Sequence, residues 1–133
     1  MTRRERVRAR YGGLCAFSGA PLGETWQVDH VMPVRRGRKG KPKLKARDGE
    51  DNMVPCLAEV NHYKSSLSVE RFRARLLTLH RRLARLPANP RTDKGRRRKA
   101  YLLKVAGAFG ITTDAPFNGV FYFEKEGAIS SAS

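Results

Sequence analysis

The residues best suited to chemistry lie in the first half of the chain. Asp29 and His30 are adjacent, and Asn52 is followed nine positions later by Asn61. Carboxylate and amide oxygens are hard ligands, and magnesium typically takes one or two of them while water and substrate phosphate complete its octahedron. A neutral imidazole beside such a metal can accept a proton from an attacking water. These side chains are the parts needed for one-metal hydrolysis of a phosphodiester.

Each of these residues also has an ordinary structural interpretation. An Asp-His pair at a strand end is most often polar surface, and Asn52 suits a turn or a cap. Asn61 by itself is typical of an exposed residue on a helix. Their order and spacing, together with the basic residues around them, favour the catalytic interpretation.

Local patterns predict the elements that must position these side chains. β-Branched and apolar residues predict a strand over 26–34, with Pro33 at its end or at an edge, and an extended segment over 52–57. A loop over 35–51 joins them, and a helix is expected over 58–64. Adjacent strand residues point to opposite faces, so Asp29 and His30 can share a reaction centre only at the rim or a bend of the strand.

The rest of the chain is predicted to be mainly helical. Thr2 caps a helix over 3–11, and an apolar stripe predicts one helix from Val69 to Leu86, ended by Pro87. Also expected are a turn over 15–21, a helix over 97–109 ended by Gly110, a strand over 120–124 and a disordered tail over 127–133. We therefore expect an α+β fold with a single domain over 1–126. The stripe spans less than three heptads, which favours packing within the domain but permits a homodimer.

Composition narrows the classes of partner. The chain has 133 residues, with 28 Lys and Arg against 12 Asp and Glu, a net charge of +16. At 40% hydrophobic it is too apolar for a disordered basic tail. No apolar run approaches the ~18 residues of a membrane span, and the charged N-terminus does not resemble a secretory signal. Two cysteines fit a reducing cytosol, and the charge points to a polyanion, first of all nucleic acid.

The basic residues form three clusters. One lies near the N-terminus, a second between Arg35 and Arg47 contains eight basic residues and no acidic one, and a third between Arg81 and Lys99 contains nine opposed only by Asp93. A surface that needed only solubility would mix both signs. Phosphate binding gains from counterion release, so these clusters favour a nucleic-acid partner without indicating catalysis.

Three motifs together resemble a known family. They are Asp-His-Val-Met-Pro at 29–33, Asp-Asn-Met-Val-Pro at 51–55 and Asn-His-Tyr-Lys at 61–64. In this order and spacing they resemble the HNH (ββα-metal) nucleases over about residues 11–76. The resemblance implies a ββα-metal core with flanking helices. A weaker similarity of residues 121–124 to a closing strand of some bacterial and phage members implies a C-terminal strand.

The resemblance also implies roles. His30 is the general base, Asp29 and Asn61 are the metal ligands, and Asn52 orients His30. His62 is the rival ligand if the register is shifted by one residue. Lys64 contacts phosphate or only caps its helix. One divalent metal is implied for each active site, with magnesium expected and manganese or others as alternatives.

The sequence departs from the family at its cysteines. Many members hold a structural zinc with two Cys-x-x-Cys pairs, whereas this chain keeps only Cys15 and an offset Cys56. A closed zinc site needs four ligands, so we expect no structural zinc. Leu57 and Val60 are instead expected to pack near Cys15 and Phe17. A Cys15–Cys56 disulfide is the less favoured alternative in a cytosolic protein.

The function implied is a metal-dependent endonuclease that hydrolyses DNA, mainly double-stranded, by nicking or cutting with weak sequence preference. The loop between His30 and Asn52 is expected to grip the DNA backbone. The alternative is a basic nucleic-acid-binding module on the same fold with little or no catalysis. The expected setting is the cytoplasm of a bacterial cell, with a phage or mobile-element origin and other DNA-processing subunits as open options. The expected nucleic-acid contacts are Arg35, Arg36, Arg38, Lys39, Lys41, Lys43, Lys45 and Lys64.

Overall fold

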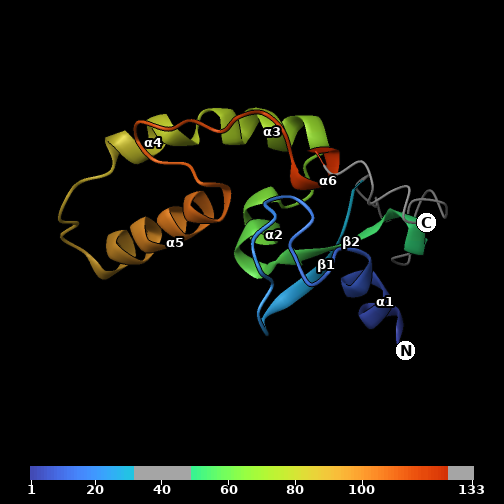
Figure 1. The fold of residues 1–133 in the computed structure, drawn as a ribbon. Helices are drawn as coiled ribbons and strands as arrows, with labels where there is room; N and C mark the ends of the chain where they lie inside the picture. The colour runs from blue at the N-terminus through green and yellow to red at the C-terminus, as the bar shows by residue number, and fades with distance from the viewer. Residues whose placement is uncertain (32–48, 126–133) are drawn as a thin grey trace, which may run out of the picture.

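The computed structural model describes residues 1–31 and 49–125 (Figure 1). A two-stranded antiparallel sheet is combined with several helices, which confirms the expected α+β class. No helix in these ranges is both long and apolar enough to cross a membrane. The elements are α1 (Arg3–Arg10), β1 (Trp26–His30), the 3₁₀ turn η3 (Glu50–Asn52), β2 (Met53–Leu57), α2 (Ala58–Lys64), α3 (Val69–Leu77), α4 (Leu79–Arg85), α5 (Asp93–Phe109) and α6 (Tyr122–Lys125).

A hairpin followed by a helix forms the centre of the fold. β1 pairs with β2 so that Asp29 lies opposite Val54 and His30 opposite Met53, and α2 follows β2 directly. The predicted order of strand, strand and helix is confirmed, and α2 occupies the predicted positions 58–64. β1 ends at His30. Residues 32–34 of the predicted strand, and residues 35–48 of the predicted loop, lie outside the described residues.

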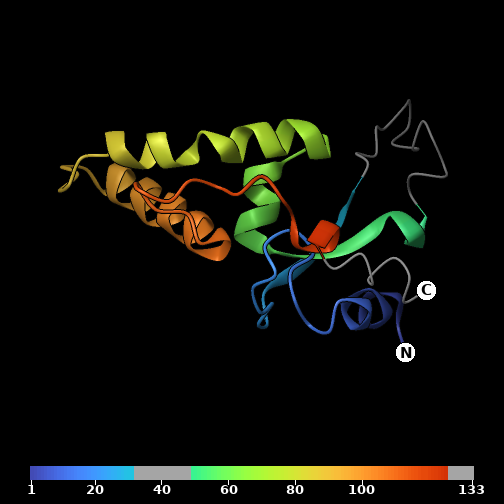
Figure 2. The same ribbon diagram turned by 45° about the horizontal axis from the view of Figure 1, so that its top comes forward.

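Helix α2 lies between the hairpin and the longer helices. In Figures 1 and 2, α3 and α4 run in line along one side, α5 lies beside them, and α2 separates this helical layer from β1 and β2. Its two sides therefore meet different surroundings, one formed by the sheet and the other by α3 and α5.

Helix α1 is fixed to the hairpin by part of the N-terminal basic cluster. Thr2 and Glu5 form a reciprocal capping box, which confirms the predicted helix start. Arg4 stacks on Trp26, with Cζ 3.8 Å from the ring centroid, and Arg10 donates to the Met53 carbonyl at 2.6 Å. These two guanidinium groups stabilise the fold, so only the remaining part of the cluster is available to a polyanion.

The predicted helix over 69–86 is wrong as one continuous element, because it breaks at Thr78 into α3 and α4. Thr78 has φ −106° and ψ −2°, and its hydroxyl donates to the Arg75 carbonyl at 3.1 Å. This local bond gives the backbone an alternative to regular helical pairing. The stripe itself is confirmed, since its four central members are buried in the core: Phe72, Leu76, Leu79 and Leu83.

Helix α5 starts earlier than predicted and ends where predicted. The Thr92 hydroxyl accepts from the Gly95 N–H at 2.9 Å, so the helix begins at Asp93 rather than near Arg97. It ends at Phe109, and Gly110 takes the left-handed conformation with φ 71° that favours glycine at this position.

The predicted C-terminal strand over 120–124 is wrong, because the segment forms the short helix α6. The Glu124 carboxylate accepts from the Phe121 N–H at 2.9 Å and caps the turn. The backbone N–H groups of Tyr122 and Phe123 donate to the Phe17 and Ala16 carbonyls, both at 2.9 Å. Phe121 and Phe123 pack on Phe17 instead of alternating between the faces of a strand. The tail predicted over 127–133 lies outside the described residues.

Arg73 on α3 holds this C-terminal segment in place. Its guanidinium donates to both Glu124 carboxylate oxygens and to the Gly119 carbonyl, each at 2.6 Å. It also pairs with Glu70 and lies over the Phe121 ring. The hydrogen bond from Arg73 lowers the pKa of Glu124 below its ordinary value of 4.5. One arginine thus links α3 to a segment far along the sequence.

Replacing Arg73 with methionine should therefore destabilise the fold in a pH-dependent way. We expect the free energy of unfolding at neutral pH to fall by about 1.5–3 kcal/mol, the usual range for hydrogen bonds to charged groups. Because the folded-state pKa of Glu124 is lowered, the stabilisation is present above the ordinary pKa and is lost as pH falls through the lowered value. Urea unfolding at a series of pH values measures this difference.

The matched control is Arg71→Met, because Arg71 is an exposed arginine on the same helix. The role of Arg73 would be contradicted if Arg71→Met lowered the free energy of unfolding by the same amount. It would also be contradicted if the stability difference between the wild type and Arg73→Met did not shrink at acid pH.

Candidate metal and nucleic-acid site

The ammonium group of Lys64 connects the last turn of α2 to the end of β1. It lies 3.2 Å from Asp29 Oδ2 and donates to the His30 carbonyl at 3.2 Å. The Lys64 side chain is 1% exposed and that of Asp29 12% exposed. A buried ion pair of this kind is costly to break from one side, so it fixes α2 against β1.

Asn61 lies one turn before Lys64 and also reaches β1. Its amide NH₂ group donates to the Gln27 side-chain oxygen. Gln27 and Asp29 are two positions apart on a strand, so they share a face. The structure therefore brings the two predicted ligands, Asp29 and Asn61, to the same face of β1. Because the NH₂ group is bound to Gln27, the amide oxygen is the atom of Asn61 left for a metal.

His30 and Asn52 lie together at the open end of the hairpin. His30 is the last residue of β1, and strand alternation directs its side chain away from the Asp29 face. The Val31 N–H donates to the Asn52 carbonyl at 3.0 Å, which extends the pairing one step past the strands. The predicted base is thus at the rim of the sheet, the one place where it can share a centre with Asp29.

His62, the rival ligand, faces another part of the molecule. Its side chain is exposed, and its ring meets Tyr101 of α5 edge-on, with 5.4 Å between centroids. The two neighbouring residues on α2 are therefore separated, Asn61 toward the sheet and His62 toward α5. This geometry favours Asn61 as the ligand.

The predicted nucleic-acid contacts have different outcomes. Those from Arg35 to Lys45 lie outside the described residues. Lys64 is buried, and its ammonium could meet a phosphate only by leaving Asp29. The third basic cluster is largely exposed along α4, the following linker and the start of α5.

The two cysteines lie in the apolar core beneath this site. The expected burial is confirmed, since Cys15, Phe17 and Val60 belong to one buried cluster and Leu57 packs against it. Both cysteines are free thiols. Burial raises the pKa of Cys15, but hydrogen bonds from Cys56 and Ser18 outweigh it and lower the pKa to about 6. Burial and the bond to Cys15 raise the pKa of Cys56, so Cys56 is the proton donor of the pair.

The donor set can be tested against a divalent metal by its chemistry. Among residues 1–31 and 49–125, no three or more His, Cys, Asp or Glu residues form a metal-binding group. The candidate site instead offers one carboxylate and one amide oxygen. This set fits magnesium, which commonly takes one or two protein oxygens. The Asp29 oxygen that lies 3.2 Å from the Lys64 ammonium is Oδ2.

Sequence reasoning missed the partners that arrange these ligands. Gln27 carries no motif, and its role emerges only because it lies two positions before Asp29 and faces α2. The burial of Lys64 was also missed, although its spacing of three from Asn61 indicates a shared helix face.

Comparisons with protein-family models, with curated proteins and with solved structures found no match to this chain.

The Lys64–Asp29 pair can be tested by a double-mutant cycle. Lys64→Met should lower the free energy of unfolding by about 3–5 kcal/mol, because it leaves the Asp29 carboxylate buried without its counter-charge. Asp29→Asn should also lower the free energy of unfolding. The double variant should lose less stability than the sum of the two single variants, with a coupling energy of about 1–3 kcal/mol. Urea unfolding of the four proteins provides these values.

The exposed Asp93–Arg96 pair on α5 is the matched control. The same cycle with Asp93→Asn and Arg96→Met should give a coupling close to zero, because solvent screens a surface pair. Additive effects of Lys64→Met and Asp29→Asn would show that the buried pair is not the link between α2 and β1.

Proposed function

We propose that this protein is a metal-dependent endonuclease of the HNH class that hydrolyses phosphodiester bonds in DNA. The observation that supports it most is that Asn61 on α2 lies against the face of β1 that carries Asp29. His30 is adjacent to Asp29 at the strand end, and Asn52 lies beside it on η3. These are the residues whose motifs resemble that family.

Each residue has a defined task in the proposed reaction. The His30 imidazole accepts the proton of the attacking water, and Asn52 holds the end of the hairpin so that this ring is oriented. The Asp29 carboxylate and the Asn61 amide oxygen would hold magnesium, which stabilises negative charge on the scissile phosphate when it is bound. The water oxygen bonds to phosphorus as the bond from phosphorus to O3′ breaks, and O3′ takes a proton from solvent, leaving a 3′-hydroxyl and a 5′-phosphate.

The charge distribution supports DNA as the substrate. The net charge is +16, and the exposed basic residues of α4, α5 and their linker are opposed by a single acidic residue, Asp93. The basic residues between positions 35 and 47 lie in sequence between His30 and Asn52, where they would contact the DNA backbone. Contacts of this kind position a duplex without reading its sequence, so weak sequence preference is expected.

A second candidate is a basic nucleic-acid-binding module without catalysis. The observation that favours it is the position of Lys64, whose ammonium lies 3.2 Å from Asp29 Oδ2 and already balances that carboxylate. In such a module the pair would serve stability alone.

Plasmid nicking separates these candidates. The wild type should nick supercoiled DNA with magnesium or manganese and not with a chelator. His30→Ala should lower the rate by about 10²–10⁴-fold, the usual contribution of a general base. Full activity in His30→Ala would refute the base assignment. If the wild type binds DNA but fails to cleave it in the presence of any divalent metal tested, the binding module would be established instead.

The ligand assignment can be tested by comparing two neighbours. Asn61→Ala should raise the magnesium concentration needed for half-maximal nicking by about tenfold or more, because an oxygen ligand is lost. At saturating DNA, His62→Ala should leave it unchanged, because this ring faces α5 and is no metal ligand. Asn61→Asp, which keeps an oxygen at this position, should recover metal dependence close to that of the wild type. The opposite ranking of the two alanine variants would show that the register is shifted by one residue.

A further inference from the structure

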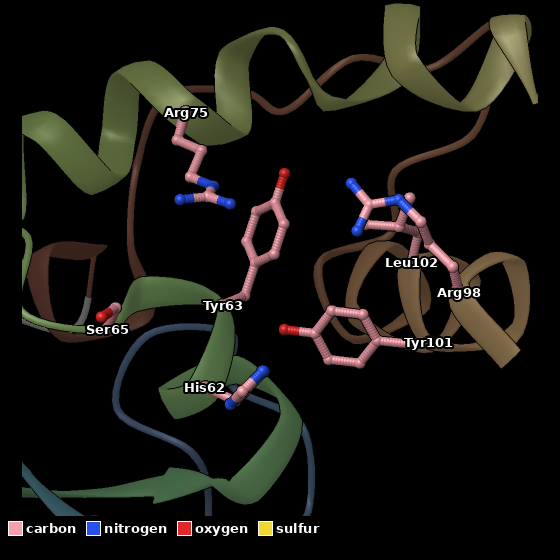
Figure 3. Close-up of a pocket in the computed structure, with 7 residues that line it drawn as sticks. All are labelled: His62, Tyr63, Ser65, Arg75, Arg98, Tyr101 and Leu102. Carbon is pink, nitrogen blue, oxygen red and sulfur yellow. The ribbon is translucent and has the colours of Figure 1, made fainter. Parts of the chain in front are cut away.

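A concave site separate from the one described above lies on the side of α2 that faces away from the sheet. It is a pocket of about 330 Å³ between α2, α3 and α5 (Figure 3). None of the residues assigned to metal or proton chemistry lines it. Its lining residues are His62, Tyr63, Ser65, Arg75, Arg98, Tyr101 and Leu102.

The pocket is strongly cationic. Arg75 from α3 and Arg98 from α5 are exposed residues that approach Tyr63 from opposite sides in Figure 3. No carboxylate is among the described lining residues. Guanidinium groups match the geometry of phosphate oxygens, so two of them in one concave site favour a phosphorylated ligand.

Aromatic rings form the other part of the lining. Tyr101 meets His62 at 5.4 Å and Tyr63 at 6.3 Å between ring centroids. Burial is the main reason why the pKa of Tyr101 is raised, while Arg75 and Arg98 act in the opposite direction. The Tyr101 hydroxyl donates to the Glu59 carbonyl at 3.4 Å, which orients this ring in the lining. Rings beside arginines are the combination that binds a base together with its phosphates.

Tyr63 forms the floor of the pocket, and contacts with two arginines fix its ring. Arg75 Cζ lies 4.3 Å from the Tyr63 ring centroid, and Arg82 of α4 donates to the Tyr63 hydroxyl at 3.1 Å. Tyr63 is 3% exposed, so it is a fixed part of the core. A site whose floor is fixed loses less entropy when a ligand binds.

Ser65 adds a strained backbone position to the wall. It ends α2 with φ 55° and ψ −136°, and it is the one residue other than glycine with positive φ in the described chain. Strain of this kind is concentrated at functional sites. Here the turn places a hydroxyl group in the lining, where a glycine would offer none.

We infer that this pocket binds one nucleotide of a single-stranded stretch of nucleic acid. The base packs against Tyr101 and His62, and the flanking phosphates lie at Arg75 and Arg98. A strand is favoured over a free nucleotide because Arg98 belongs to the basic cluster between Arg81 and Lys99, which extends beyond the pocket along α4 and α5. The inference rests on the proposed function in one respect, the choice of DNA as the polymer.

The inference refines the substrate of the proposed nuclease. A paired, stacked base cannot enter a pocket, so the strand must be unpaired at this point. Asn61 and His62 are neighbours on α2 but face the sheet and the pocket respectively. DNA with a frayed or single-stranded segment next to a duplex would therefore be bound better than a fully paired duplex.

The test compares two probes with the same phosphates. One is a short oligothymidylate, and the other is the same oligomer made entirely of abasic sites. Binding is measured by fluorescence anisotropy in a chelator, so that no cleavage occurs. The wild type should bind the base-containing oligomer about fivefold or more tightly, as expected for one stacked base.

Variants locate this preference in the pocket. Tyr101→Leu should bring the ratio of the two affinities close to one, whereas Tyr101→Phe, which keeps the ring, should preserve it. The double variant Arg75→Gln/Arg98→Gln should lower the ratio and reduce the salt dependence of binding by a slope of about 1.4, for two lost phosphate contacts on a single strand.

Arg71→Gln/Arg97→Gln is the matched control, because it removes the same charge from exposed positions on the same two helices. It should weaken both oligomers together and leave their ratio unchanged. Thermal unfolding of each variant checks that the fold is retained.

Three results would overturn the inference. They are a ratio close to one in the wild type, a ratio unaffected by Tyr101→Leu, and an equal drop in the ratio for both double variants. These outcomes are distinct from failure of the proposed function. If the protein nicks plasmids but shows no base preference, only the pocket assignment is refuted. If it shows the preference but never nicks, only the proposed nuclease function is refuted.

Discussion

The arrangement of this protein depends on the buried ammonium group of Lys64. Among the Lys, Arg, Asp and Glu residues in the described part of the chain, Lys64 is the one that is fully buried. It pairs with Asp29, bonds to the His30 carbonyl and lies 5.7 Å from the Phe17 ring centroid. A buried charge must keep its partners, so this contact fixes both the position and the rotation of α2. That rotation turns Asn61 toward β1 and His62 toward α5, so the two faces of one helix have different surroundings.

The small sheet needs this support. Two strands of five residues are marginal alone, and their stability must come from packing against other elements. The aromatic cluster supplies it, because Phe17 contacts Phe72, Phe121 and Phe123 from distant parts of the chain. The Cys15–Cys56 contact lies in the same core, between the turn after α1 and β2. The end of the hairpin that carries Asp29 and His30 is therefore positioned by a core that is rich in aromatic rings.

The sequence predicted those features that arise from local signals. The Thr2 cap, the end of α5 at Gly110 and the limits of α2 each follow from residues within one or two turns, and the apolar stripe from helical periodicity. It failed where a single side chain offered the backbone a competing hydrogen bond, as at Thr78 and Glu124. It also missed contacts between residues far apart in sequence, such as Asn61 with Gln27 and Arg73 with Glu124. Neither residue of these pairs indicates its partner, because the contact exists only once the fold brings them together.

In the proposed nuclease, the same ion pair determines how a metal would be held. Asp29 and Lys64 have opposite unit charges, and Asn61 is neutral, so the protein offers no net negative charge to a divalent cation. A site with two carboxylates would attract the cation even without substrate, whereas this site lacks that attraction. The negative charge that is missing can come from the phosphates of bound DNA, which also complete the coordination that magnesium prefers. Metal and DNA should therefore bind cooperatively, and the basic residues that gather the DNA also determine when the metal is held.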